Sequence, residues 1–140
     1  MSSIVVSGGF DPIHIGHIRM FNEAKSLTNP MGGELIVIVN SDEFLKEKKG
    51  YVFMPFEERM EVIANLKAVD RVIPSIDEDE TVCETLRALF EDLSNKVSVF
   101  ANGGDRKDQE DVPEFDVCQH YGVSLLFNVG GGKTQASSKL

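Results

Sequence analysis

The stretch Ile4-Val5-Val6-Ser7-Gly8-Gly9-Phe10-Asp11-Pro12-Ile13-His14-Ile15-Gly16-His17 decides the fold of this chain. Its β-branched start is typical of a buried strand, and the two glycines mark a tight turn after it. From residue 16 the pattern becomes helical, because apolar side chains recur every three or four positions at Ile18, Phe21 and Ala24. The segment therefore predicts a strand, a glycine turn and a helix in close succession.

The alternation of strand and helix continues along the chain. Strands are predicted at 35–39, 71–74, 97–100 and 123–127, and helices at 41–45, 55–66, 81–93 and 111–121. The unbroken apolar run at 35–39 is typical of a strand that is buried on both faces of a parallel sheet. The sequence thus predicts a single α/β domain over residues 1–140, a Rossmann-like, doubly wound, five-stranded parallel sheet with helices on both faces.

Two charged stretches between these elements are predicted to be solvated loops. The first is Lys46-Glu47-Lys48-Lys49-Gly50, in which we expect Lys48 and Lys49 to be solvated rather than catalytic. The second is Asp77-Glu78-Asp79-Glu80, where adjacent carboxylates repel one another and no glycine-containing ligand loop surrounds them.

Composition excludes several classes of protein. The 140 residues include 23 acidic and 14 basic side chains, and the net charge of −9 argues against a general nucleic-acid binder. A local basic pocket can still hold a small phosphorylated ligand. Cys83 and Cys118 are isolated, as reduced core thiols are, and they predict neither a disulfide framework nor a metal site. Without a signal peptide or a membrane-spanning apolar run, we expect a cytoplasmic protein with no membrane partner.

The chemistry is expected at the carboxyl ends of the predicted strands, where ligands bind in open α/β sheets. Many of the basic residues follow these ends, which is the arrangement that a polyphosphate requires. After the first strand, Gly8 and Gly9 allow a ligand to approach the backbone closely, and the next helix directs its N-terminus at the same place. His14 and His17 flank the start of that helix, so both imidazoles are predicted to reach the same phosphates.

The motif Gly8 to His17 resembles the signature of the cytidylyltransferase-like nucleotidyltransferases, a phenylalanine-aspartate pair followed by His-x-Gly-His. Four further elements resemble that family in the same order. They are Asn40-Ser41-Asp42-Glu43 with Lys46, Pro55-Phe56-Glu57-Glu58-Arg59 with the following Val69-Asp70-Arg71-Val72, Gly103-Gly104-Asp105, and Lys133-Thr134-Gln135-Ala136-Ser137-Ser138.

The resemblance implies a role for each matching residue. His14, His17 and Lys46 would be catalytic, with the histidines stabilising charge at the α-phosphate. Arg59, with Lys46, would bind the phosphate of the acceptor. The nucleotide would be bound by Gly8, Gly9, Phe10, Asp11, Gly16, Gly104, Asp105, Lys133, Ser137 and Ser138.

The implied activity is the transfer of CMP or AMP from CTP or ATP to a phosphorylated small molecule, with release of pyrophosphate. Mg²⁺ would arrive with the nucleotide, and many members of the family are homodimers. The overall pattern resembles the cytidylyltransferases that act on glycerol 3-phosphate. The Gly-Gly-Asp element and the Lys-x-Gln-x-Ser-Ser tail are closer to the adenylyltransferases that act on heptose 1-phosphate. The alternative is a catalytically silent nucleotide-binding module, because the fold alone does not imply an activity.

Overall fold

The computed structural model describes residues 3–28, 32–79, 81–92, 96–101 and 112–126. These residues form one parallel sheet in the order β3-β2-β1-β4-β5. Its strands are β1 (Ser3–Gly8), β2 (Leu35–Val39), β3 (Arg71–Pro74), β4 (Val97–Ala101) and β5 (Ser124–Leu126). The helices are α1 (Ile15–Thr28), α2 (Asp42–Lys49), α3 (Phe56–Ala64), α4 (Cys83–Glu91) and α5 (Phe115–His120).

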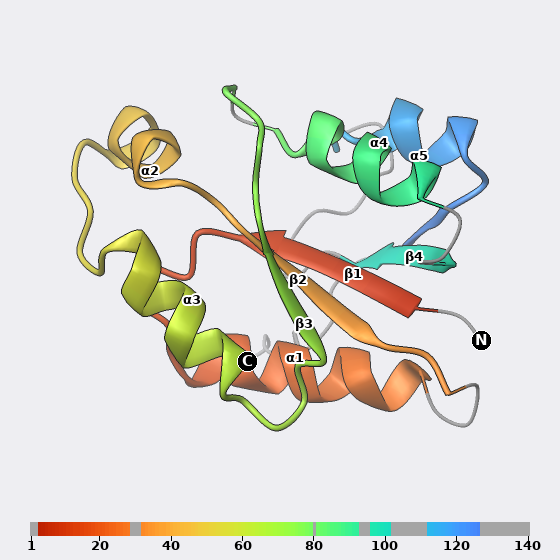
Figure 1. Cartoon of the computed structure of the whole chain (residues 1–140), viewed down its shortest axis with the longest axis horizontal. Coiled ribbons are helices and arrows are strands. Elements are labelled where there is room, and N and C mark those ends of the chain that lie inside the picture. Colours follow the sequence, from red (N-terminus) through yellow and green to blue (C-terminus); the bar gives the residue numbers. More distant parts are fainter. Residues whose placement is uncertain (1–2, 29–31, 80, 93–95, 102–111, 127–140) are drawn as a thin grey trace, which may run out of the picture.

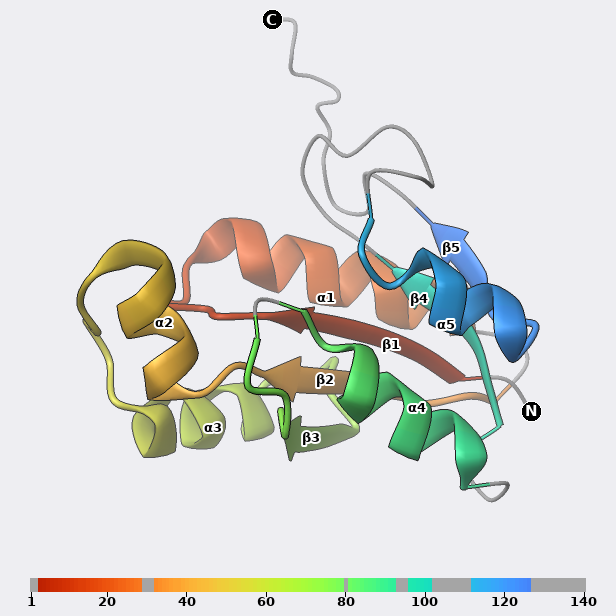
Figure 2. The same ribbon diagram turned by 90° about the horizontal axis from the view of Figure 1, so that it is seen from above.

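Helices cover both faces of this sheet, as the sequence predicts. Figure 1 shows α1 and α3 on one side of the strands and α4 and α5 on the other. Seen from above, the strands run side by side from β3 at one edge to β5 at the other (Figure 2). The chain leaves β1 toward β2 and β3 first, and returns to the far side of β1 for β4 and β5. This reversal beside β1 is the point at which open α/β sheets bind ligands.

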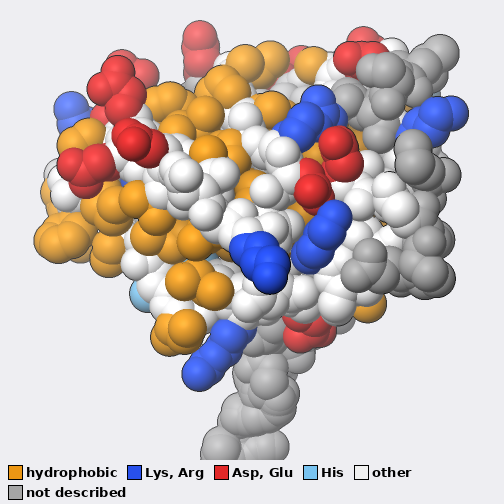
Figure 3. All heavy atoms as spheres, turned by 60° about the horizontal axis from the view of Figure 1, so that its bottom comes forward, with side chains coloured by type: hydrophobic (Ala, Val, Ile, Leu, Met, Phe, Trp, Pro, Cys, Tyr) orange, Lys and Arg blue, Asp and Glu red, His pale blue; other side chains and the backbone are white. Residues whose placement is uncertain are grey.

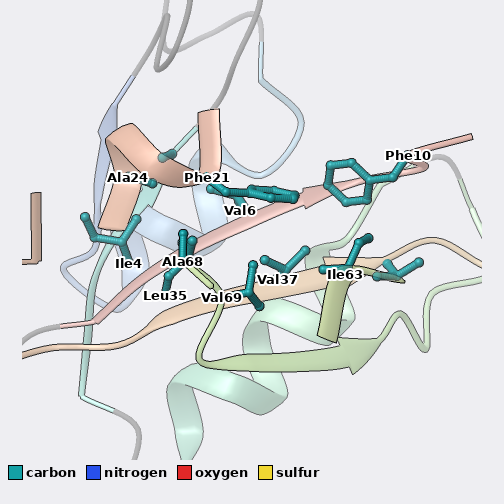
Figure 4. Packing of buried hydrophobic residues seen from close by; sticks show 12 residues of the cluster. Ile4, Val6, Phe10, Phe21, Ala24, Leu35, Val37, Ile63, Ala68 and Val69 are labelled. Carbon is teal, nitrogen blue, oxygen red and sulfur yellow. The ribbon is translucent and has the colours of Figure 1, made fainter. Parts of the chain in front are cut away.

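The sheet is buried by two separate hydrophobic clusters because alternate side chains of each strand point to opposite faces. Val6 and Val37 lie in the cluster under α1 and α3, whereas Val5 and Ile36 lie in the cluster under α4 and α5. All five residues of β2 are fully buried, which explains its unbroken apolar sequence. In Figure 4, Phe10 lies at one end of the first cluster, at the same end as Ile63.

The charged stretch 46–50 is not a loop. The helix α2 continues through Lys49, and Ser41 accepts a hydrogen bond from the Phe44 N–H at its start. Gly50 ends the helix with φ of 87°, and its N–H donates to the Lys46 carbonyl. Three lysines in the last turn stabilise the helix by interacting with the negative end of its dipole. The run of charges that suggested a loop is therefore the C-terminal end of a helix.

The acidic stretch that begins at Asp77 is also not entirely solvated. Asp77 is buried, and its carboxylate accepts hydrogen bonds from the backbone N–H groups of Glu84 and Thr85. It therefore satisfies donors in the first turn of α4. In α3 the charged Arg59 is buried, whereas the apolar Ala64 is exposed.

Some large hydrophobic side chains remain on the surface. Tyr51, Phe53 and Ile15 are among the most exposed, and all three are close in sequence to the glycine turn or to the end of α2. Figure 3 shows hydrophobic side chains gathered toward the end of the molecule that carries α2 and α3 in Figure 1. Homodimerisation, which the family resemblance implies, stays a prediction.

Candidate active site

A cavity of about 540 Å³ opens at the carboxyl end of β1, where the strand order reverses. The residues that line it come from the glycine turn, the start of α1, the end of β2, the helix α2 and the segments that precede α4 and α5. They are Ser7, Gly8, Gly9, Phe10, Asp11, Pro12, His14, His17, Asn40, Phe44, Leu45, Lys48, Lys49, Thr81, Val82, Phe100 and Glu114.

The two glycines of the turn are needed because their neighbours come too close for a side chain. A Cβ on Gly8 would lie 2.9 Å from Phe10 Cζ, and a Cβ on Gly9 would lie 2.7 Å from Leu45 Cδ2. Both distances are shorter than a carbon–carbon contact allows. The turn therefore packs directly against the Phe10 ring and α2, and this packing forms part of the cavity wall.

Phe10 packs between the histidine pair and the hydrophobic core. Its backbone has φ of 54°, its side chain is 4% exposed, and its ring makes edge contacts with His17 and Phe21. The centroids of the Phe10 and His17 rings are 5.0 Å apart. Phe10 also lines the cavity, but most of its ring belongs to the hydrophobic core. Its position fits the support of His17 better than the stacking of a nucleotide base.

His14 and His17 lie together, as the motif predicts. Their rings are stacked with centroids 3.9 Å apart and an interplanar angle of 27°. The Gly16 N–H donates to His14 Nδ1 over 3.1 Å, and the His14 N–H donates to His17 Nδ1 over 3.1 Å. Because each Nδ1 is an acceptor, the proton of each neutral imidazole is on Nε2. The pair therefore offers two fixed Nε2–H donors.

The backbone N–H groups at the start of α1 already have hydrogen-bond partners within the protein. The N–H groups of His17 and Ile18 donate to the His14 carbonyl, and that of Gly16 donates to the His14 ring. These first donors of α1 are therefore engaged by His14 rather than left free for phosphate. The positive end of the helix dipole still lies at the histidine pair, so anions are favoured there.

The histidines differ in their surroundings. His14 is exposed, whereas His17 is half-buried between Phe10 and the His14 ring. Burial, and the charge of a protonated His14, lower the pKa of His17 to about 4. His17 is therefore a neutral hydrogen-bond donor near pH 7, and it lacks the second ring proton that a general acid would give up.

Asp11 holds the rim of the cavity together. Its side chain is 1% exposed, and it accepts hydrogen bonds from the N–H groups of Phe53 and Met54. Lys49 Nζ lies 3.0 Å from the same carboxylate and also donates to the Asp11 carbonyl. Burial opposes ionisation, but these donors outweigh it and lower the pKa of Asp11. The carboxylate is thus already engaged, and it fixes the segment between α2 and α3.

The lysines of α2 are arranged differently from the expectation. Lys48 and Lys49 line the cavity, whereas Lys46 is exposed and is not among its lining residues. The helical form of residues 46–49 accounts for Lys48, because positions two residues apart point to nearly opposite sides of a helix. Lys48 and Lys49 were expected to be solvated because a run of charges is typical of a loop, but both line the cavity.

Arg59 is placed where it cannot meet a ligand at the surface. Its side chain is 0% exposed. Nη1 donates to the carbonyls of Gly9 and Asn40, each over 2.8 Å, and Nε donates to the Met54 carbonyl. Nη2 pairs with Asp42 Oδ1 at 2.6 Å. The guanidinium thus joins the glycine turn, the end of β2, α2 and the segment before α3, and the acceptor-binding role implied by the resemblance has no exposed guanidinium to support it.

The sequence predicts no role for two buried polar residues of the cavity. Asn40 and Glu114 are each 6% exposed, and both line the cavity. Asn40 follows directly after a strand, a position that could have indicated a site residue. Glu114 lies just before α5, and nothing in its sequence context marks it.

Gly104, Asp105, Lys133, Ser137 and Ser138 lie outside the described residues, so their predicted nucleotide contacts stay predictions. Within the described part of the chain, no group of three or more His, Cys, Asp or Glu side chains could hold a metal ion. No helix among the described residues is long and apolar enough to cross a membrane.

Comparison with known proteins links this site to a family. The model of the cytidylyltransferase-like family matches residues 5–116. Bifunctional protein HldE of Cronobacter sakazakii is 37% identical over 115 residues, which are 73% of this chain and 23% of the relative. The protein of the same name from Vibrio atlanticus is 37% identical over 131 residues, covering 92% of this chain and 25% of the relative. The chain thus spans about a quarter of the length of these relatives.

The fold is shared with solved structures. The crystal structure of the lipopolysaccharide core biosynthesis protein from Thermoplasma volcanium superposes with a TM-score of 0.67 and 24% identity. The match covers 91% of this chain and 93% of that one. At this identity the likeness concerns the fold.

Proposed function

Because the chain belongs to the cytidylyltransferase-like family of nucleotidyltransferases, we propose that it transfers a nucleoside monophosphate from an NTP to a phosphorylated small molecule. The nucleotide would be CTP or ATP, and the acceptor a sugar phosphate or a polyol phosphate. The observation that carries this proposal is the stacked pair His14–His17, which offers two Nε2–H donors at one cavity and at the positive end of α1.

The reaction needs no protein nucleophile. A phosphate oxygen of the acceptor would attack the α-phosphorus and form the new P–O bond. The bond from the α-phosphorus to the bridging oxygen would break, and pyrophosphate would leave with the electron pair. Negative charge builds on the phosphate oxygens as this happens, and fixed donors that stabilise it are the main source of rate in such transfers.

The residues of the cavity would divide this work. His14 and His17 would donate to the α-phosphate and to the departing oxygen. Lys48 and Lys49 line the same cavity and would attract the polyphosphate, and Lys49 would do so while also pairing with Asp11. Mg²⁺ would come with the NTP and be held mainly by phosphate oxygens and water, as this ion commonly is. A cytoplasmic location fits such substrates.

The direct test is a screen for pyrophosphate release. The protein would be incubated with each of the four common NTPs and Mg²⁺, against glycerol 3-phosphate, sugar 1-phosphates and phosphorylated amino alcohols. We expect one NTP and one acceptor class to release pyrophosphate and to give an NDP-linked product visible by ³¹P NMR. Binding of an NTP without pyrophosphate release from any acceptor would favour the catalytically silent module instead.

A further inference from the structure

The cavity combines two kinds of polar group that come from different elements of the fold. The donors and cations, His14, His17, Lys48 and Lys49, come from the start of α1 and from α2. Glu114 comes from the segment before α5, which covers the face of the sheet opposite α1 in Figure 1. Phosphate groups are attracted to the cations and repelled by the carboxylate. The phosphates of a bound nucleotide or acceptor are therefore expected near the cations. The rest of the ligand then lies near groups that accept hydrogen bonds.

Asn40 is the most unusual of these acceptors. It is 6% exposed, its N–H donates to the Gly8 carbonyl, and its own carbonyl accepts from Arg59. Its side-chain Oδ1 is buried and has no hydrogen-bond partner among the described residues. A buried acceptor without a partner destabilises the folded protein, and nearly all such atoms are paired in native structures. Asn40 lines the cavity, so a turn of its amide would offer the buried Oδ1 to a ligand bound there.

The chemistry of Oδ1 restricts that partner to a hydrogen-bond donor. A triphosphate oxygen near pH 7 has no proton to donate, so it does not fit. Glu114 has one carboxylate oxygen that accepts from the Val82 N–H over 3.0 Å, and its negative charge likewise favours donors over phosphate. Hydroxyl groups are the donors that both substrates of the proposed reaction carry, on the ribose of the NTP and on the acceptor.

We propose that Asn40 Oδ1 accepts a hydrogen bond from a hydroxyl group of the bound substrate, so that this cavity selects hydroxyl-bearing ligands. The inference rests on the proposed function for the identity of the substrates, but it concerns binding and does not require turnover. Asn40 acts in it as a specificity residue. Arg59 holds the backbone of Asn40, and the end of β2 is thereby fixed beneath the cavity.

The experiment compares binding of paired ligands by isothermal titration calorimetry. The pairs are ATP and CTP with their 2′-deoxy and 3′-deoxy forms, glycerol 3-phosphate with 1,3-propanediol phosphate, and glucose 1-phosphate with its 2-deoxy analogue. We expect the wild-type protein to bind one deoxy analogue about 10- to 100-fold more weakly, because Oδ1 is then buried without a partner. The pair that responds identifies the ribose or the acceptor as the source of the hydroxyl.

Asn40→Leu removes the acceptor atom and should bind both members of that pair equally. Asn40→Asp keeps an oxygen in the same place and should keep the preference for the hydroxyl. The control is Asn22→Leu, the same substitution at an exposed position of α1, which should behave as wild type. Melting curves establish that each variant is folded before its binding is compared.

The inference is overturned if no pair is discriminated by the wild-type protein, if none of the ligands binds, or if Asn40→Leu discriminates as well as wild type. Pyrophosphate release, measured on the same samples, separates this outcome from the proposed function. Hydroxyl-dependent binding that Asn40→Leu abolishes, without any pyrophosphate release, would uphold the inference and contradict the transferase. Pyrophosphate release without any preference for the hydroxyl-bearing ligand would support the transferase and contradict the inference about Asn40.

Discussion

Gly16 lies against the histidine pair, and its lack of a side chain decides where the His14 ring sits. A Cβ at this position would lie 2.9 Å from His14 Cε1 and 3.1 Å from His14 Nδ1. The same residue donates its N–H to that Nδ1 and so fixes the tautomer. Gly16 therefore leaves room for the His14 ring and holds it by a hydrogen bond.

We predict that Gly16→Ala lowers kcat by about 10- to 100-fold, because a displacement of about an ångström is enough to misplace a catalytic donor. The melting temperature should be unchanged or higher, since alanine favours the first turn of a helix more than glycine does. Steady-state kinetics and a melting curve measure both quantities. A Gly16→Ala protein with wild-type kcat would show that the His14 ring position is not critical.

At the scale of the elements, Arg59 joins parts of the chain that are far apart in sequence. Its hydrogen bonds reach the turn after β1, the end of β2, the first turn of α2 and the segment before α3. Asp11 fastens that last segment from the other side through Phe53 and Met54. The walls of the cavity are thus held together by one buried cation and one buried carboxylate, and neither is free to bind a ligand.

We predict that Arg59→Ala destabilises the protein by about 3–5 kcal/mol, because the carbonyls of Gly9 and Asn40 lose their charged partner. Arg59→Lys should recover only part of this stability, since an ammonium cannot reproduce the guanidinium fork. Urea unfolding measures the change. The matched control is Arg87→Ala, which breaks an exposed pair with Glu84 and should change stability by less than about 0.5 kcal/mol. Unchanged stability of Arg59→Ala, with a selective rise in the KM of the acceptor, would instead support the acceptor-binding role.

For the whole molecule, the buried titratable groups make stability depend on pH. The pKa of His17 is lowered to about 4 by burial and by the charge of His14, so between about pH 4 and 6.5 the unfolded chain binds more protons at this residue than the folded protein does. Stability therefore rises with pH across that window and is lost as pH falls. Hydrogen bonds and a neighbouring lysine lower the pKa of Asp11 and of Asp70 by more than desolvation raises it, and the stability that these carboxylates contribute is lost at still lower pH.

We predict that His17→Gln makes the free energy of unfolding less dependent on pH between about 6.5 and 4, while the two proteins have parallel profiles from pH 7 to 8. Urea unfolding at half-unit intervals of pH measures both profiles. Parallel slopes below pH 6.5 would show that His17 titrates at its ordinary value in the folded protein.

The layout of the whole chain could be predicted largely from its sequence, because apolar periodicity and glycine turns are local signals. The strands, their parallel arrangement, the helices on both faces and the pairing of the histidines all follow from such signals. The burial of Arg59 could not be predicted, since it depends on carbonyls supplied by three other segments. The helical form of 46–49 was missed because a run of charges resembles a loop until its position at a helix end is known. The pairing of Asp11 with Lys49 likewise depends on contacts that only the folded chain makes. The same holds for the Asn40 side-chain oxygen, which has no hydrogen-bond partner in the described part of the chain.

The central claim is that His14 and His17 stabilise the charge that develops at the α-phosphate. The most direct measurement is kcat of His14→Ala and His17→Ala, with the NTP and acceptor found in the pyrophosphate screen and with a melting curve for each variant. We predict that each substitution lowers kcat about 100-fold or more while the fold survives, because losing one preorganised donor costs roughly 10²–10³ in rate. The double variant should lose less than the product of the two single losses, since both residues act on one charge. A folded His14→Ala or His17→Ala protein with near-normal kcat would contradict the account.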